Sequence, residues 1–315
     1  MLLRGKIWNQ KGRKMKHVIL ILILYTQLAQ AQDYNAFFDA SSTSEHSTIA
    51  ATISNTTVPF TMIEGMMVVE AYVNEVKGNF IIDTGAPTLV LNEQPINSAQ
   101  HNGRGISEGL ATDEISVSAF SWSSIQKKNL PAFKVDISHL EKVSGTELAG
   151  IIGYDILKDI SLFVNYSSQT VQLRPTSQKP TRQPIAVIPF TMQGHLPVIK
   201  VKIGKKRLHL ALDTASESNI LDQKFLKKID PKLIVAVRAG EMQGVDQKIK
   251  QVTIATISGT NVKDRDLADM NYLFTDLSHL KAESHIYIDG LLGYPFFKQG
   301  QISINYKERK LYVYE

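Results

Sequence analysis

The chain contains an internal repeat. Residues 58–92 align without a gap to residues 188–222 at an offset of 130, and eight of these 35 positions are identical. Average composition would give roughly two such matches. Similarity resumes at an offset of 140, where residues 150–173 align with residues 290–313. Two copies of one unit predict a pair of homologous lobes, because a stacked repeat protein needs at least three copies.

The residue pattern inside each copy favours β-strands. Apolar residues alternate with polar ones or form β-branched runs, which is typical of half-buried strands. Helical signals are few and short. The sequence therefore predicts an all-β chain with a few short helices. Strands are expected at 67–73, 115–120, 161–166, 170–173, 197–203, 251–257, 302–306 and 310–314, and helices around 92–99, 136–142, 153–158, 222–229 and 276–281.

Composition outside the repeat indicates the boundaries of the lobes. Residues 41–57 hold ten Ser and Thr among seventeen and favour a flexible arm, or a short pro-segment. Three prolines within 174–187 favour a linker between the lobes. We expect a signal peptide at 1–31, an arm at 32–57, a first lobe at 58–174, a linker at 175–187 and a second lobe at 188–315.

The N-terminal residues have the pattern of a secretory signal. A basic stretch precedes the apolar run 18–25, and small residues follow at Ala29 and Ala31. Eight apolar residues cannot span a bilayer, which needs about 20. Met15 is an alternative start, since the residues after it already form a complete signal. We expect export to the periplasm or the medium, a mature chain from Gln32 and no membrane span after cleavage.

The positive charge belongs to the expected leader. The chain has 35 basic and 30 acidic residues, and the six basic residues within 1–31 leave 29 against 30, a formal charge of −1. Nucleic-acid binding is therefore not expected. The chain has no cysteine, which excludes disulfides, thiol catalysis and Cys-ligated zinc.

The repeat preserves one chemically distinctive loop. An apolar strand ends in Asp-Thr in both copies, followed by two small residues, at 83–86 and again at 213–216. About 70 residues later each copy has Gly, two apolar residues, Gly and Tyr, at 150–154 and 290–294. A lone Asp-Thr-Gly would be read as a turn. Two copies at matched positions, each with the same glycine motif, favour a functional pair.

These motifs resemble the aspartic peptidases, in particular the retropepsin-like branch duplicated within one chain. The resemblance covers roughly residues 58–314. It implies that each lobe is a retropepsin-like β-barrel unit and that a strand threads beneath each loop, here 151–153 and 291–293. It also implies catalysis by Asp83 and Asp213, with the other loop residues as supports: Thr84, Gly85, Thr214, Ala215 and Ser216.

The implied activity is hydrolysis of peptide bonds in a polypeptide substrate. Two carboxyl groups held close together cannot both ionise easily, so they share one proton. The ionised member takes a proton from water, and the protonated member hydrogen-bonds the scissile carbonyl. No metal and no cofactor are expected, and two lobes in one chain predict a monomer.

The sequence departs from the family pattern at Ala215, where the family usually has Gly. Ala costs little there if φ is negative, and roughly 1 kcal/mol or more if φ is positive. Glycine-bearing stretches at 102–112 and 239–247 are either flap hairpins over the cleft or ordinary surface turns. The substrate-binding candidates in them are Gly105, Gly109 and Gly244.

Two other classes of function stay open. A catalytically weak or silent relative would bind extended peptides in the same cleft, and a β-rich envelope protein would carry coincidental Asp-Thr turns. No His-Glu-x-x-His and no Gly-x-Ser-x-Gly motif is present, which counts against a zinc protease and a serine hydrolase. The repeat-equivalent His139 and His279 are expected to be capping or packing residues on opposite lobes.

Overall fold

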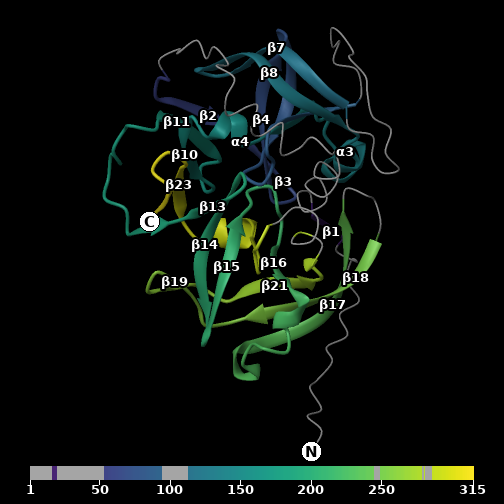
Figure 1. Cartoon of the computed structure of the whole chain (residues 1–315), viewed down its shortest axis with the longest axis vertical. Coiled ribbons are helices and arrows are strands. Elements are labelled where there is room, and N and C mark those ends of the chain that lie inside the picture. The colour runs from purple at the N-terminus through teal and green to yellow at the C-terminus, as the bar shows by residue number, and fades with distance from the viewer. Residues whose placement is uncertain (1–15, 20–52, 94–112, 245–248, 279, 281–285) are drawn as a thin grey trace, which may run out of the picture.

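The structure is a computed structural model that describes residues 16–19, 53–93, 113–244, 249–278, 280 and 286–315. Strands dominate, and the α-helices with defined bounds within this part of the chain are short. Two lobes lie one above the other in Figure 1, the first in blue and the second in green. The prediction of an all-β, two-lobed fold is confirmed.

Within the described residues, the first lobe contains ten strands and two helices. Its elements are β2 (Thr56–Pro59), β3 (Thr61–Ile63), β4 (Met66–Val73), β5 (Val76–Ile82), β6 (Leu89–Asn92), β7 (Asp113–Trp122), β8 (Ile125–Val135), α3 (Ser138–Ser144), β9 (Gly150–Ile152), α4 (Tyr154–Leu157), β10 (Ile160–Asn165) and β11 (Thr170–Pro175).

The second lobe repeats this order and adds short elements. They are β12 (Ala186–Pro189), β13 (Thr191–Gln193), β14 (Leu196–Ile203), β15 (Lys206–Leu212), β16 (Asn219–Asp222), the 3-10 helices η1 (Gln223–Phe225) and η2 (Pro231–Leu233), β17 (Ile234–Gly244), β18 (Ile249–Ile257), β19 (Thr260–Val262), β20 (Arg265–Asp266), β21 (Met270–Thr275), β22 (Gly290–Leu292), α6 (Tyr294–Phe297), β23 (Gln301–Asn305) and β24 (Lys310–Tyr314).

The two lobes have the same strand connections around their central loops. In the first lobe, β9 lies between β5 and β6, parallel to β5 and antiparallel to β6. In the second lobe, β22 lies in the same way between β15 and β16. Each inserted strand is the Gly-apolar-apolar segment of the repeat, so a late part of each copy returns to the place where its Asp-Thr loop begins.

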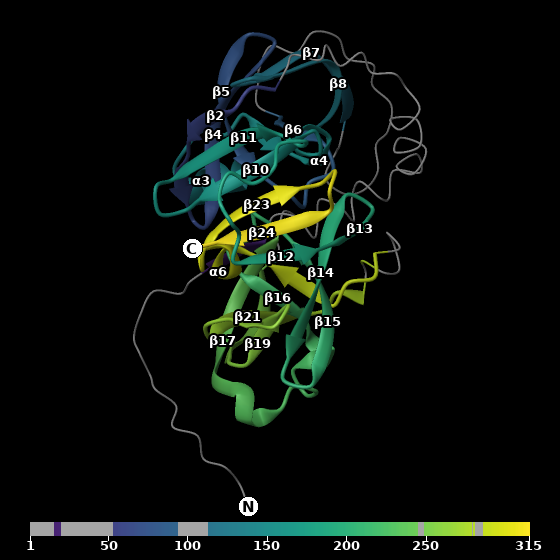
Figure 2. The same ribbon diagram turned by 90° about the vertical axis from the view of Figure 1, so that its left-hand side faces the viewer.

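A six-stranded sheet joins the lobes. Its order is β12-β24-β23-β10-β11-β2, so each lobe contributes three strands. The seam is the antiparallel pair β10–β23, in which Ser161 faces Asn305 and Val164 faces Ile302. Ser161 and Ser303 approach to 3.0 Å through their hydroxyl oxygens. Figure 2 shows this sheet between the two lobes.

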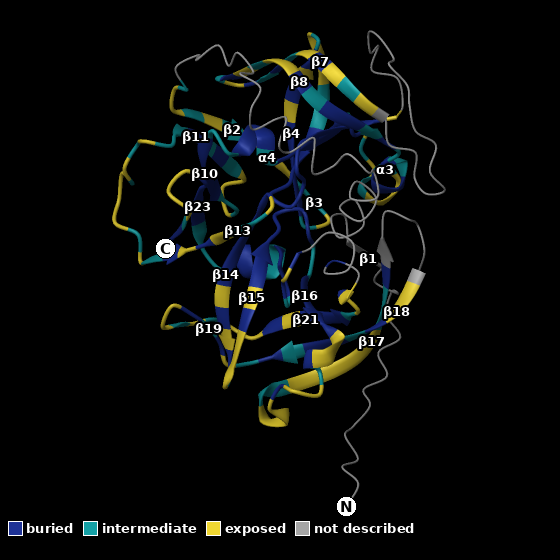
Figure 3. Ribbon diagram, in the orientation of Figure 1, coloured by how far each residue is buried: buried dark blue, intermediate teal, exposed yellow. Residues whose placement is uncertain are grey.

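The repeat also reproduces the burial of individual strands. β4 and β14 share one pattern, with four buried residues followed by alternation. Glu70 on β4 and Lys200 on β14 are exposed at equivalent positions. The interior is continuous across the seam, where Leu162 packs opposite Ile304 in one apolar cluster. Figure 3 shows this buried centre and the more exposed β17 at the edge of the second lobe.

Several predicted elements differ in detail. The helices expected around 136–142 and 153–158 are α3 and α4, but the signal around 222–229 produces only the 3-10 helix η1. The Asp222 side chain accepts a hydrogen bond from the backbone N–H of Lys224, which caps a single turn. The predicted helix at 92–99 lies mostly outside the described residues.

One expected boundary shifts. The arm predicted to run to residue 57 ends earlier, because β2 begins at Thr56 and pairs with β11. In the glycine-bearing stretch at 239–247, residues 239–244 belong to β17, which pairs antiparallel with β18 as in a hairpin. Of the expected leader, the structure describes only β1 (Lys16–Ile19), parallel to β17. No helix within the described parts of the chain is long and apolar enough to cross a membrane.

Candidate active site

Each Asp-Thr loop begins where a central strand ends. Asp83 follows β5 and Asp213 follows β15. The backbone N–H of Asp83 donates to the Ile152 carbonyl at 3.0 Å, and that of Asp213 donates to the Leu292 carbonyl at 3.0 Å. The inserted strands β9 and β22 therefore hold both aspartates at the same height in their lobes.

The second glycine of each motif permits a close backbone approach. A Cβ on Gly153 would lie 2.3 Å from the Thr88 carbonyl oxygen, and one on Gly293 would lie 2.4 Å from the Ser216 carbonyl oxygen. Such distances exclude any side chain unless the backbone moves. These glycines let the inserted strand pass directly beneath the loop, which is why the motif recurs with the Asp-Thr pair.

The two threonines interlock the lobes. The Thr84 hydroxyl donates to the Leu212 carbonyl at 2.9 Å and accepts from the Thr214 N–H at 3.1 Å. The Thr214 hydroxyl donates to the Ile82 carbonyl at 2.9 Å and accepts from the Thr84 N–H at 3.1 Å. The four bonds are reciprocal and buried, so each loop is positioned by the other lobe.

The aspartates are buried inside this arrangement. Asp83 is 1% exposed and Asp213 is 0% exposed. Asp83 Oδ1 accepts from the N–H groups of Gly85 at 2.7 Å and Ala86 at 3.2 Å, and Asp213 Oδ1 accepts from the Ala215 N–H at 3.0 Å. Oδ2 of each carboxyl is buried and accepts no hydrogen bond from the described residues.

This environment holds protons on the pair. Burial raises the pKa of Asp83 from 3.8 to about 7, against the opposing effect of the Gly85 and Ala86 N–H groups. Burial also raises the pKa of Asp213, and the charge of Asp83 raises that pKa further. Two carboxyls that influence each other in this way titrate as a pair. At mildly acidic pH the pair keeps at least one proton.

Ala215 fits its loop without strain. Neither Ala215 nor its repeat partner Gly85 has a positive φ, so the loop does not require glycine. The Ala215 methyl group is buried in an apolar cluster that also contains Ala86. The departure from the family pattern therefore adds packing and leaves the aspartate in place.

We expect Ala215→Gly to change kcat/KM by well under tenfold, less than about 1.4 kcal/mol. The same change should lower the free energy of unfolding by about 0.5–1 kcal/mol, because it removes a buried methyl group and frees the unfolded backbone. Peptide-cleavage kinetics and guanidinium unfolding of the two proteins measure both effects. An inert wild type with an active Ala215→Gly variant would overturn the assignment of this residue as a packing group.

The structure adds His195, which the sequence analysis did not single out. It lies in the two-residue turn between β13 and β14 in the second lobe, and its imidazole is fully buried. Nε2 lies 2.5 Å from the carbonyl oxygen of Gly85, in the Asp-Thr loop of the first lobe. The Tyr154 ring lies 6.5 Å away. Position 65, its repeat partner, is glycine, so no sequence comparison between the copies marks this residue.

The remaining predicted residues have simpler positions. Ser216 Oγ donates to the Ser218 carbonyl at 2.7 Å, which closes the second loop. Gly244 is the last residue of β17, while Gly105 and Gly109 lie outside the described residues. His139 is buried in α3, as expected for a packing residue, and His279 is not described.

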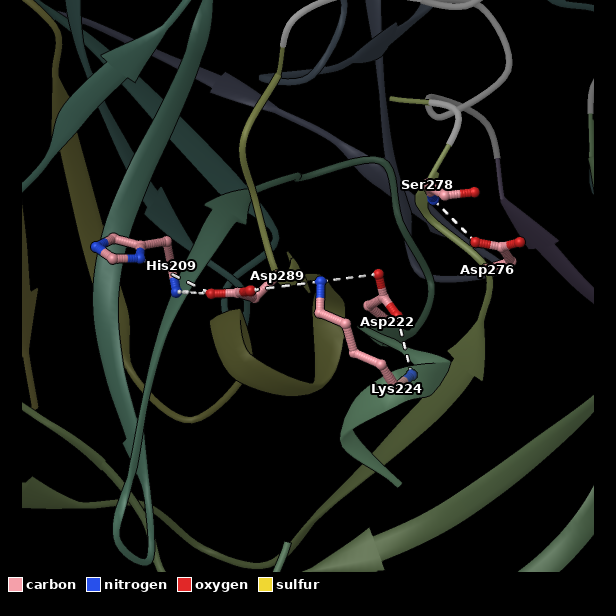
Figure 4. A network of polar contacts seen from close by, with 6 residues as sticks. All are labelled: His209, Asp222, Lys224, Asp276, Ser278 and Asp289. Atoms are coloured by element: carbon pink, nitrogen blue, oxygen red, sulfur yellow. Dashed lines mark hydrogen bonds and ion pairs between the residues drawn. The ribbon is translucent and has the colours of Figure 1, made fainter. Parts of the chain in front are cut away.

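A separate polar network borders a cavity of about 1130 Å³ in the second lobe, which neither aspartate of the pair lines. Lys224 Nζ lies 3.1 Å from Asp222 and 3.9 Å from Asp289, and Asp289 accepts from the His209 N–H (Figure 4). The repeat partner of Asp222 is Asn92, which donates to the Leu148 carbonyl at 3.0 Å. The two repeat positions therefore make different polar contacts: Asn92 to the Leu148 carbonyl, and Asp222 to Lys224.

No protein-family model and no curated protein sequence matches the chain. Among the residues that the structure describes, no group of three or more His, Asp or Glu side chains could hold a metal ion.

Proposed function

We propose that the chain is an exported aspartic endopeptidase whose catalytic pair is Asp83 and Asp213. The observation that carries the proposal is the reciprocal Thr84–Thr214 interlock beside two buried carboxyls in equivalent loops. A turn that only ends a strand needs neither a second copy nor a contact across the lobes. Two acids that share a proton can activate water and polarise the peptide carbonyl without a metal.

The chemistry follows from the hydrogen bonds at each aspartate. Both aspartates accept backbone N–H bonds that favour their ionised forms, but the charge of Asp83 also raises the pKa of Asp213, so Asp83 is the ionised member and Asp213 carries the shared proton. Asp83 removes a proton from a water molecule that attacks the peptide carbonyl, while Asp213 donates a hydrogen bond to the carbonyl oxygen. The tetrahedral intermediate then breaks its C–N bond, and the proton taken by Asp83 passes to the leaving amine.

Because the pair is buried, substrate access requires a change of conformation. Both carboxyls are almost completely inaccessible in this conformation, so a polypeptide reaches them only after the surrounding chain opens. A silent peptide-binding relative would need the same opening but would leave bound peptides intact. The two functions are therefore separated by cleavage and not by binding.

The test is cleavage of a peptide library by the chain from Gln32 onward, across pH 3–7, followed by mass spectrometry of the products. Defined cut sites that disappear in Asp83→Asn support an endopeptidase. Stabilisation by a pepstatin-type inhibitor without any cleavage indicates the peptide-binding alternative. Neither cleavage nor stabilisation would leave the envelope structural protein as the better description.

We expect activity to be highest at mildly acidic to neutral pH, to fall in more acidic solution and to survive chelation. Burial raises the pKa of Asp83 to about 7, so the pair takes up a second proton and loses its base as pH falls below that value, while the raised pKa of Asp213 retains the proton that the carbonyl needs. The kcat/KM profile with pH, measured with and without EDTA, checks both parts. Loss of activity in EDTA with recovery on adding zinc would contradict the mechanism.

A further inference from the structure

His195 lies at one end of a hydrogen-bond chain that leads to Asp83. A carbonyl oxygen only accepts, so the 2.5 Å contact between Nε2 and the Gly85 oxygen places the ring proton on Nε2. The Gly85 carbonyl and the Ala86 N–H belong to one peptide group. That N–H donates to Asp83 Oδ1 at 3.2 Å. One peptide group therefore connects the imidazole to the carboxylate.

Hydrogen bonds in such a chain strengthen one another. Donation to the carbonyl polarises the peptide group and makes its N–H a stronger donor, by about 10–30% per bond in a buried environment. A stronger Ala86 N–H favours the ionised form of Asp83 over the protonated form. The first lobe cannot act on the second in the same way, because Gly65 stands at the repeat position of His195.

The charges around the chain preserve this asymmetry. Burial lowers the pKa of His195 to about 4, so the ring is neutral at the working pH, although the Gly85 bond and the Asp155 charge oppose that effect. The Tyr154 ring packs beside it. Besides Asp213, the titratable group whose interaction with Asp83 is resolved is Tyr306, and burial keeps its phenol protonated.

We propose that His195 is a positioning residue that favours Asp83 over Asp213 as the ionised member of the catalytic pair. The role of the pair as a water-activating dyad rests on the proposed peptidase function. Which of the two aspartates is ionised does not depend on that function, because it is a property of the protein without substrate. Loss of the His195 donor would weaken the preference for an ionised Asp83 without removing either aspartate.

The test compares the protein with His195→Leu, which removes the donor, and His195→Gln, whose amide places an N–H near the position of Nε2. A second apolar variant, His195→Met, covers the case in which Leu does not fold. His139→Leu is the matched control, because it removes a buried histidine of the first lobe that lies outside the loops. Titration of ¹³Cγ-labelled aspartate, assigned with Asp83→Asn, follows the pair without any need for activity.

We expect the apolar variants to raise the pKa of Asp83 by about 0.1–0.7 unit, the effect of a 10–30% weaker charge-assisted bond. The acidic limb of kcat/KM should move upward by the same amount, while Gln and the His139 control stay at the wild-type value. Two results would overturn the proposed hydrogen-bond chain: an unchanged carboxyl titration in a folded apolar variant, or a shift in His195→Gln equal to that in the apolar variants. If the wild-type protein cleaves no peptide, the peptidase proposal is wrong, but the aspartate titration still tests the hydrogen-bond chain from His195.

Discussion

Asp83→Asn and Asp213→Asn should each reduce kcat by roughly 10³-fold or more while the protein stays folded. In the proposed mechanism, each substitution removes either the group that takes the proton from water or the group that donates to the carbonyl, and an amide replaces neither. The two losses should not add in the double variant, since the pair acts as one unit. Peptide-cleavage kinetics with circular dichroism as a check of folding measure this effect.

The chain supplies a matched control for the exchange of a buried aspartate. Asp222→Asn changes a residue that is 7% exposed, follows the same loop and has Asn92 as its repeat partner. It should retain turnover within a few-fold. Equal losses in Asp222→Asn and Asp213→Asn would show that any buried aspartate in this lobe is needed for folding, and would remove the argument for a catalytic pair.

Asp83→Asn should also change how the stability of the protein depends on pH. The folded-state pKa of Asp83 lies above the unfolded value of 3.8, so the folded protein binds more protons and stability is lost as pH rises from about 4 to about 7. Asp83→Asn should therefore gain stability relative to wild type above pH 7, by at least about 1 kcal/mol, the value of one pKa unit. Other titrating groups, including His195, contribute equally to both proteins, so their contributions cancel in the difference between the two free energies of unfolding.

Thr84→Val should lower the free energy of unfolding by about 2–5 kcal/mol. The substitution keeps the side-chain shape but removes the hydroxyl, which leaves the Thr214 N–H and the Leu212 carbonyl buried without their partners. Activity should fall as well, because the loop that carries Asp83 is no longer held against the second lobe. Guanidinium unfolding, with the slope compared between variants, gives the stability change.

Thr84→Ser is the control for this change, since it keeps the hydroxyl and loses one methyl group, at a cost of about 1 kcal/mol. Thr214→Val should resemble Thr84→Val because the four bonds are reciprocal. The double variant should cost less than the sum of the two single ones, as expected for residues that share partners. If Thr84→Val is as stable as Thr84→Ser, the interlock does not hold the lobes together.

Local patterns in the sequence predicted most of the secondary structure. The strand pattern in both copies, the Asp-Thr loops and the glycine motifs were visible because each depends on residues close together in the chain. The duplication went further, since equal residues at offsets of 130 and 140 predicted two lobes with equivalent loops. The prediction failed around 222–229, where an Asp222 cap and a single 3-10 turn replaced a helix.

Only the tertiary structure decided how these pieces meet. The hydroxyl bonds between Thr84 and Thr214 join residues 130 positions apart, and the placement of β9 beneath the first loop depends on pairing with both β5 and β6. The sequence showed that Ala215 stands where the family usually has glycine, but only the structure gives the sign of φ at that residue. His195 was hidden for the same reason: its partner, Gly85, lies 110 residues away in the other lobe, and only the packing of the two lobes brings the imidazole to that carbonyl.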